Sequence, residues 1–210
     1  MNTSIEIISA DGASKTTLFH REGFSAFSGL WSPAGDKIAL SVGRYFRAAG
    51  LPPAQIGLIK PDGSTFRLIV DDDMNNGFPS WAPDGDRLVF KRGRQLVVTS
   101  LADGAVVPLT DASYYSNFPQ WSPDSDRIMF TANRDGDFEL YTTRPDGTRL
   151  RRLTDVPGHD ATRPSVPTAT GSFSAARARD SRMRWRCTTL CLSRTARSSR
   201  CALTARMYGS

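Results

Sequence analysis

One short motif recurs three times in this chain, each time beginning with a tryptophan. Trp31, Trp81 and Trp121 are spaced 50 and 40 residues apart, and each is followed by Ser or Ala, then Pro, with Asp at the sixth position. Repeats of about 40–45 residues that consist of short strands and turns are typical of β-propeller blades. The motif therefore predicts an all-β chain built from similar, successive units.

Two further signals recur out of phase with the tryptophan motif. One is an Asp-Gly pair, which favours a tight turn because glycine adopts positive φ and the aspartate side chain caps the turn. The other is a pair of Leu, Ile or Thr residues that follows each Asp-Gly. The pairs are Asp11-Gly12, Asp62-Gly63, Asp103-Gly104 and Asp146-Gly147, and then Thr17-Leu18, Leu68-Ile69, Leu109-Thr110 and Leu153-Thr154.

Each complete repeat reads as four short strands. In the middle repeat, strands rich in β-formers are expected at 78–81, 87–90, 95–99 and 106–109. Pro83 and Gly85 mark the turn between the first two. The flanking repeats follow the same plan, with strands at 27–31, 37–42, 55–60 and 66–70, and at 117–121, 127–131, 138–142 and 149–153.

Incomplete units flank the three complete ones. The chain begins with only the last two strands of a unit, at 4–9 and 15–19, and residues 162–165 resemble the opening strand of another. Ten extra residues of the first complete repeat fall within a loop at 44–53. The sequence predicts a partial, open β-propeller of four-stranded antiparallel blades over residues 1–166. The tryptophans are expected to pack between blades, because one blade cannot bury its own faces.

The motifs resemble the TolB-like propeller repeat, a relative of the WD-repeat blade. That repeat reads Pro-x-Trp-Ser-Pro-Asp-Gly, then a strand that ends in Phe, then Asp-Gly and Leu-Thr. The match covers roughly residues 4–165 and is weaker around Trp31, where Ala34 stands in place of Asp. The repeat occurs in periplasmic TolB, in stand-alone bacterial propellers and in prolyl oligopeptidase-like peptidases. The resemblance implies the fold, whereas propellers carry unrelated functions.

The composition changes after residue 166. Residues 167–210 hold nine of the 27 basic residues, all arginine, and one of the 21 acidic residues, Asp180. Residues 1–166 are left with 18 basic and 20 acidic side chains, so the net charge of +6 belongs to the tail. Such an Arg- and Ser-rich segment is expected to be largely disordered. Its three cysteines, Cys187, Cys191 and Cys201, lack zinc-site spacing.

Two origins of this basic tail are open. It could be an arm that binds nucleic acid, or it could be read out of frame. Codons exist for residues 166–174 that, two bases later, encode Pro-Asp-Gly-Asp-Arg-Val-Val-Phe, nearly the sequence 83–90. The same shift lets residues 201–210 encode a second Asp-Gly turn. Because both motifs emerge in one frame and in order, we favour a frameshift, with no specific nucleic-acid partner.

The sequence offers no catalytic, cofactor-binding or metal-binding residues. It has no Gly-x-Ser-x-Gly motif and no phosphate-binding glycine loop, and its only histidines are His20 and His159. The run Asn133, Asp135, Asp137 and Glu139 superficially suggests calcium, but its glycine falls between the acids and the distal glutamate of a calcium loop is absent. We therefore expect no enzymatic activity.

Binding in a propeller usually takes place at the axial mouth, on the loops that enter each innermost strand. These loops carry Asn75 and Asn76, Tyr114 and Tyr115, and His159 and Asp160. The sequence thus suggests a non-enzymatic propeller that binds a protein or a ligand there. The alternative is the regulatory propeller of a prolyl oligopeptidase-like or amidohydrolase-like enzyme. Self-association through open blade edges is also expected.

The amino terminus shows no signal peptide, and no span of eighteen apolar residues occurs. As written, the chain is expected in the cytoplasm. A periplasmic location applies instead if the amino terminus is truncated.

Overall fold

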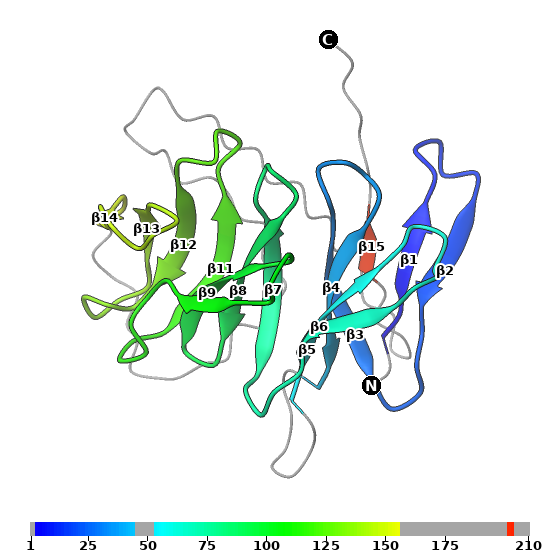
Figure 1. Cartoon of the computed structure of the whole chain (residues 1–210), viewed down its shortest axis with the longest axis horizontal. Helices are drawn as coiled ribbons and strands as arrows, with labels where there is room; N and C mark the ends of the chain where they lie inside the picture. The colour runs from blue at the N-terminus through cyan, green and yellow to red at the C-terminus, as the bar shows by residue number, and fades with distance from the viewer. Residues whose placement is uncertain (1–2, 45–52, 156–200, 204–210) are drawn as a thin grey trace.

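The computed structural model describes residues 3–44, 53–155 and, for the backbone alone, 201–203. These residues form strands and turns, without a helix among them. Four sheets follow one another along the long axis of the molecule, from β1 and β2 at one end to β14 at the other (Figure 1). The described chain is therefore a partial, open β-propeller, as the repeats predict.

Three sheets are complete four-stranded blades whose neighbouring strands are antiparallel. Each runs in chain order from an innermost to an outermost strand. The first blade holds β3 (Ser25–Trp31), β4 (Ile38–Gly43), β5 (Gln55–Ile59) and β6 (Arg67–Val70). The second holds β7 (Asn76–Trp81), β8 (Arg87–Arg92), β9 (Gln95–Ser100) and β10 (Val106–Pro108). The third holds β11 (Ser116–Trp121), β12 (Ile128–Ala132), β13 (Glu139–Thr143) and β14 (Arg151–Arg152).

The fourth sheet is the half-blade that the amino terminus predicts, with one addition. Strands β1 (Ile5–Ile8) and β2 (Lys15–Phe19) are antiparallel, and β15 (Cys201–Leu203) lies beside β1 in parallel. These three residues of the tail pair with β1, whose open edge offers backbone groups for pairing. The rest of that tail, the opening strand at 162–165 and most of the inserted loop at 44–53 lie outside the described residues.

The Asp-Gly turns form as their composition predicts. In all four, the glycine has φ between 71° and 82°. In each, the aspartate carboxylate accepts the backbone N–H two residues on, which holds the turn closed. The N–H groups of Ala13, Ser64, Ala105 and Thr148 donate to Asp11, Asp62, Asp103 and Asp146 over 2.8–3.0 Å.

The innermost strands share an irregularity that the sequence does not predict. Pairing with the second strand shifts register three residues before each tryptophan. At these bulges Ser28, Phe78 and Phe118 have φ of 52°, 56° and 51°. Bulges bend a strand and redirect one side chain. The result is a row of rings across the blades, with Phe27 and Phe78 5.8 Å apart and Phe78 and Phe118 4.8 Å apart between ring centres.

The core lies between sheets. Because strand side chains alternate, Leu88 and Phe90 of β8 pack toward the first blade, whereas Val89 packs toward the third. Trp81 and Trp121 are 6% and 7% exposed and join these inter-blade clusters, which confirms their predicted packing role. The Trp81 indole also donates from Nε1 to the Leu30 carbonyl of the preceding blade at 3.0 Å.

One hydrogen bond recurs at every junction between described sheets. The first or second residue of an innermost strand donates its N–H to a carbonyl one or two residues before the third strand of the preceding unit. The pairs are Ala26 to Thr3 at 3.4 Å, Asn76 to Ala54 at 2.8 Å and Ser116 to Arg94 at 2.8 Å. The repetition places β1 in the same structural position as β5, β9 and β13, the third strands of complete blades.

Candidate functional site

The connections that enter the innermost strands lie at one end of the sheets, together with the hairpins that join second to third strands. We call this end the mouth face. It includes residues 71–75 before β7 and residues 109–115 before β11, and the turns at Gly93 and at 133–138. In the part of the chain that the structure describes, all the predicted site residues lie at this face.

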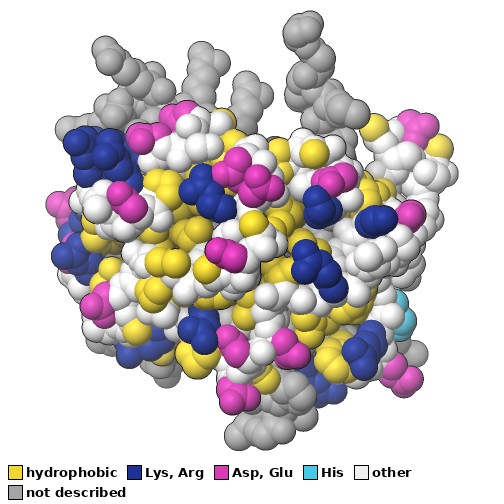
Figure 2. All heavy atoms as spheres, viewed as in Figure 1, with side chains coloured by type: hydrophobic (Ala, Val, Ile, Leu, Met, Phe, Trp, Pro, Cys, Tyr) yellow, Lys and Arg dark blue, Asp and Glu magenta, His cyan; other side chains and the backbone are white. Residues whose placement is uncertain are grey.

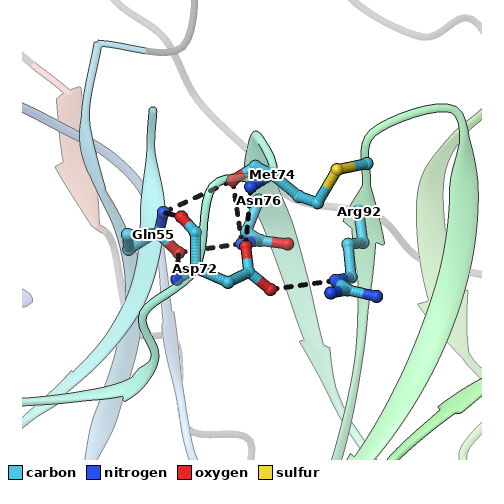
Figure 3. Close-up of polar contacts among 5 residues, drawn as sticks. All are labelled: Gln55, Asp72, Met74, Asn76 and Arg92. Atoms are coloured by element: carbon cyan, nitrogen blue, oxygen red, sulfur yellow. Dashed lines mark hydrogen bonds and ion pairs between the residues drawn. The ribbon is translucent and has the colours of Figure 1, made fainter. Parts of the chain in front are cut away.

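The connection before β7 is held by a polar network (Figure 3). The Asn76 side chain is fully buried, and its Nδ2 donates to Gln55 Oε1 at 2.8 Å, to Asp72 Oδ1 at 2.9 Å and to the Met74 carbonyl at 3.1 Å. Arg92 pairs with the other oxygen of Asp72 at 3.0 Å. The network fixes the loop on both neighbouring sheets.

Two opposing effects set the charge of Asp72. Its partial burial alone would raise its pKa. The hydrogen bonds from Asn76 and from the Met74 N–H, together with Arg92, outweigh burial and hold the pKa of Asp72 below its usual value. The carboxylate therefore stays ionised in its role as the centre of this network.

The two predicted asparagines at the mouth serve the fold. Asn75 Oδ1 accepts the Ala54 N–H at 2.9 Å, and its carbonyl accepts the Gly93 N–H at 2.9 Å. Asn76 is enclosed in the network above. The Asn76 side chain is therefore enclosed by Asp72 and Met74 of its own connection and by Gln55 of the preceding blade, and only the contact with Gln55 joins different repeats.

Of the two predicted tyrosines, Tyr115 is the exposed one. Its side chain is 44% exposed, whereas Tyr114 is half-buried against the core between the second and third blades. The Tyr115 ring lies 4.4 Å from the Arg94 guanidinium and 5.6 Å from Lys91 Nζ, measured to the ring centre. A cation over an aromatic ring is favourable because it meets the negative face of the π system.

Lys91 was not predicted as a site residue. It extends from β8 of the second blade to Asn117 Oδ1 on β11 of the third, and it is 8% exposed. Burial disfavours the charged amine and lowers the pKa of Lys91 to about 8. Nothing in the spacing of the sequence marks this lysine, since the equivalent residues in the other blades are Ser41 and Thr131.

His159 and Asp160 lie outside the described residues, so their place at the mouth stays a prediction. The acids that superficially suggest calcium have other roles. Asp135 accepts the Tyr141 hydroxyl at 2.8 Å, and Glu139 binds Arg152 at 3.0 Å and also Thr154. Within the described ranges, no three His, Cys, Asp or Glu side chains come together as metal ligands.

The opposite end of the sheets holds a shallow hollow. The three tryptophan motifs line it with one Trp and one Pro each, and its volume is about 390 Å³. Its lining residues are Leu30, Trp31, Pro33, Ser80, Trp81, Pro83, Gln120, Trp121 and Pro123. The motif residues therefore combine inter-blade packing with a surface depression.

Charges of both signs are mixed on the surface. Lys and Arg side chains are interspersed with Asp and Glu on the face drawn in Figure 2, with hydrophobic side chains between them. This agrees with the near balance of 18 basic and 20 acidic residues in 1–166. Among the residues that the structure describes, no helix is long and apolar enough to cross a membrane.

No protein-family profile matches the sequence, and no curated protein is significantly similar to it. Several solved structures share its fold. TolB from Acinetobacter baumannii has a TM-score of 0.60 and 24% identity, covering 70% of this chain and 36% of that one. A structure of the Nidogen/Laminin complex has a TM-score of 0.55 and 12% identity, covering 67% of this chain and 52% of that one. A puromycin-hydrolyzing peptidase from Mycobacterium tuberculosis has a TM-score of 0.54 and 13% identity, covering 70% of this chain and 24% of that one.

At these identities the likeness concerns the fold alone. The chain has a TolB-like β-propeller fold, in agreement with the resemblance of its repeats. It spans about a third of the length of the A. baumannii TolB and about a quarter of the peptidase.

Proposed function

We propose that this chain is a non-enzymatic binding module that contacts a protein or a small ligand at the mouth face. One observation carries the proposal. The exposed Tyr115 ring contacts both Arg94 and Lys91, and the 39%-exposed Phe118 follows it three residues later on β11, at the end of the row of phenylalanines.

This arrangement suits binding because its parts are already in place. Arg94 donates to the Ser113 carbonyl at 2.8 Å, and the Tyr115 N–H donates to Asn133 Oδ1 at 2.7 Å. Rigid aromatic and arginine side chains lose little conformational freedom on binding, and such residues dominate the energetics of many interfaces.

Selection of random displayed peptides on the immobilised chain tests this proposal. We expect the selected peptides to bind the double variant Arg94→Ala, Tyr115→Ala at least tenfold more weakly, since hot-spot residues typically contribute about 2 kcal/mol or more. Val107→Ala is the matched control, because Val107 is 59% exposed on the outermost strand β10. Peptides that bind the double variant normally but lose affinity for Val107→Ala would contradict a mouth-face site.

The alternative, a regulatory propeller of a peptidase-like enzyme, shares the same fold. Sequencing the genomic region beyond residue 210 separates the two. A restored reading frame that leads into an α/β-hydrolase domain would overturn the non-enzymatic proposal. A frame that leads only into further blades would support it.

A further inference from the structure

The edge of β1 differs from the corresponding edge in every complete blade. There, the third strand is flanked by an antiparallel second strand over five or six residue pairs: β4 beside β5, β8 beside β9 and β12 beside β13. At β1 this place is taken by β15, which runs parallel and pairs over three residues. The position of the second strand is thus occupied by a shorter strand that runs in the direction opposite to that of a second strand.

We propose that the β1 edge is an acceptor site for an extended segment supplied in trans. Such a segment would pair antiparallel with Ile5–Ile8 and displace β15. Strand addition at a sheet edge gains affinity from backbone hydrogen bonds and specificity from alternate side chains. Antiparallel pairing is slightly more stable per residue than parallel pairing, so a full-length antiparallel strand has the advantage over β15.

The complete blades show which side chains the segment would carry. Each second strand places Leu or Phe at its centre, Leu40, Phe90 and Phe130, all at most 1% exposed. The preceding residue is small or aliphatic and the following one is hydrophilic. The hydrophilic residue contacts the next blade: Ser41 Oγ accepts the Phe78 N–H at 3.1 Å, and Lys91 donates to Asn117.

The surface on which this segment would pack is already formed by β1 and the first blade. Ile5 is fully buried and packs with Ile38 and Leu40 of the first blade, and Glu6 pairs with Lys15 of β2 at 3.0 Å. Thr3 joins the half-blade to β3, since its Oγ1 donates to the Ala26 carbonyl at 2.8 Å. The acceptor strand is therefore held from its other side and from one face. The chemistry expected of the partner is an unpaired segment that reads aliphatic, aliphatic or Ala, Leu or Phe, then hydrophilic.

The test uses the full chain and a fluorescein-labelled peptide with the sequence of residues 86–93, which contains β8. Fluorescence anisotropy gives the dissociation constant. We expect saturable binding that becomes at least tenfold tighter in the variant Ala202→Pro, because proline removes a backbone donor from β15 and is poorly tolerated in a paired strand. Ala205→Pro, outside β15, is the matched control and should bind as the wild type does.

Two further measurements locate the contact. A peptide N-methylated at alternate residues should bind at least tenfold more weakly, since it lacks the donors for strand pairing. Hydrogen exchange should slow at the amides of 5–8 on peptide binding. Equal affinity of wild type and Ala202→Pro, equal affinity of the N-methylated peptide, or protection at another strand instead of β1 would each overturn the proposal.

Discussion

At the scale of single residues, the turns after the three tryptophans have the same backbone conformation but are stabilised by different side chains. The fifth residue of each motif has a left-handed backbone, and it is Gly35, Gly85 or Ser125, with φ of 71°, 75° and 62°. The aspartate whose carboxylate accepts hydrogen bonds in the turn also differs between the motifs. Asp84 and Asp124 accept backbone N–H groups of their turns, whereas in the first motif, with Ala34, Asp36 accepts the Ser32 hydroxyl at 2.8 Å. The turn therefore tolerates the loss of one aspartate where a nearby carboxylate can accept a hydrogen bond in its place.

Replacing Ser125 with glycine should stabilise the chain. A residue with a Cβ costs roughly 1 kcal/mol in the left-handed region. Ser125→Gly should therefore gain about 0.5–1 kcal/mol and raise the melting temperature by about 1–4 °C. Differential scanning calorimetry measures the change. The reciprocal control, Gly85→Ser, should lower the melting temperature. A Ser125→Gly variant that melts below the wild type would show that the strain is absent.

The turn aspartates predict how stability depends on acid. Hydrogen bonds from the hydroxyl and N–H of Ser64 lower the pKa of Asp62, and those of Thr148 lower the pKa of Asp146. A lowered folded pKa gives stability that is present above about pH 4 and is lost as pH falls through the folded value. The double variant Asp62→Asn, Asp146→Asn keeps the acceptor oxygens but not the titration. Urea unfolding between about pH 5 and pH 2.5 should show a shallower decline for it than for the wild type; parallel declines would refute these pKa shifts.

At the scale of strands and sheets, contacts between neighbouring blades decide the local structure. Repeat spacing was enough to predict the strands, because turn chemistry and β-propensity act within a few residues. It could not predict the bulges at Phe78 and Phe118 or the burial of Asn76. Those depend on side chains about 20 or more residues away, such as Gln55 beside Asn76 and Phe27 beside Phe78. The exposed Tyr115 was predicted as a candidate, whereas its partners Lys91 and Arg94 were found only in three dimensions.

The burial of Lys91 between β8 and β11 predicts that the stability of the fold changes at alkaline pH. Its folded pKa of about 8 lies below the ordinary value of 10.5. Between these values the unfolded chain binds a proton that the folded chain has lost, so stability should rise with pH in this window. Melting temperatures at about pH 8 to 10 should increase for the wild type and stay level for Lys91→Met. Lys60→Met, at an exposed lysine, is the control and should retain the rise. An unchanged rise in Lys91→Met would refute the assignment.

At the scale of the whole molecule, the described sheets form a row rather than a closed ring. The second blade has a sheet on both faces, whereas the half-blade of β1 and β2 and the third blade lie at the two ends (Figure 1). In repeat architectures each unit gains much of its stability from its neighbours. Stability should therefore differ along the chain, which the repeat alone suggests but does not quantify.

Native-state hydrogen exchange, resolved by strand, tests this account of an open propeller most directly. Amides in β8 and β9 should exchange slowest, and those in β1, β2 and β13 should exchange faster by on the order of tenfold or more, since local stability follows buried contacts. This result would place the weakest units at the two ends of the row. Equal protection in all four sheets, as a closed ring would give, would contradict the open propeller.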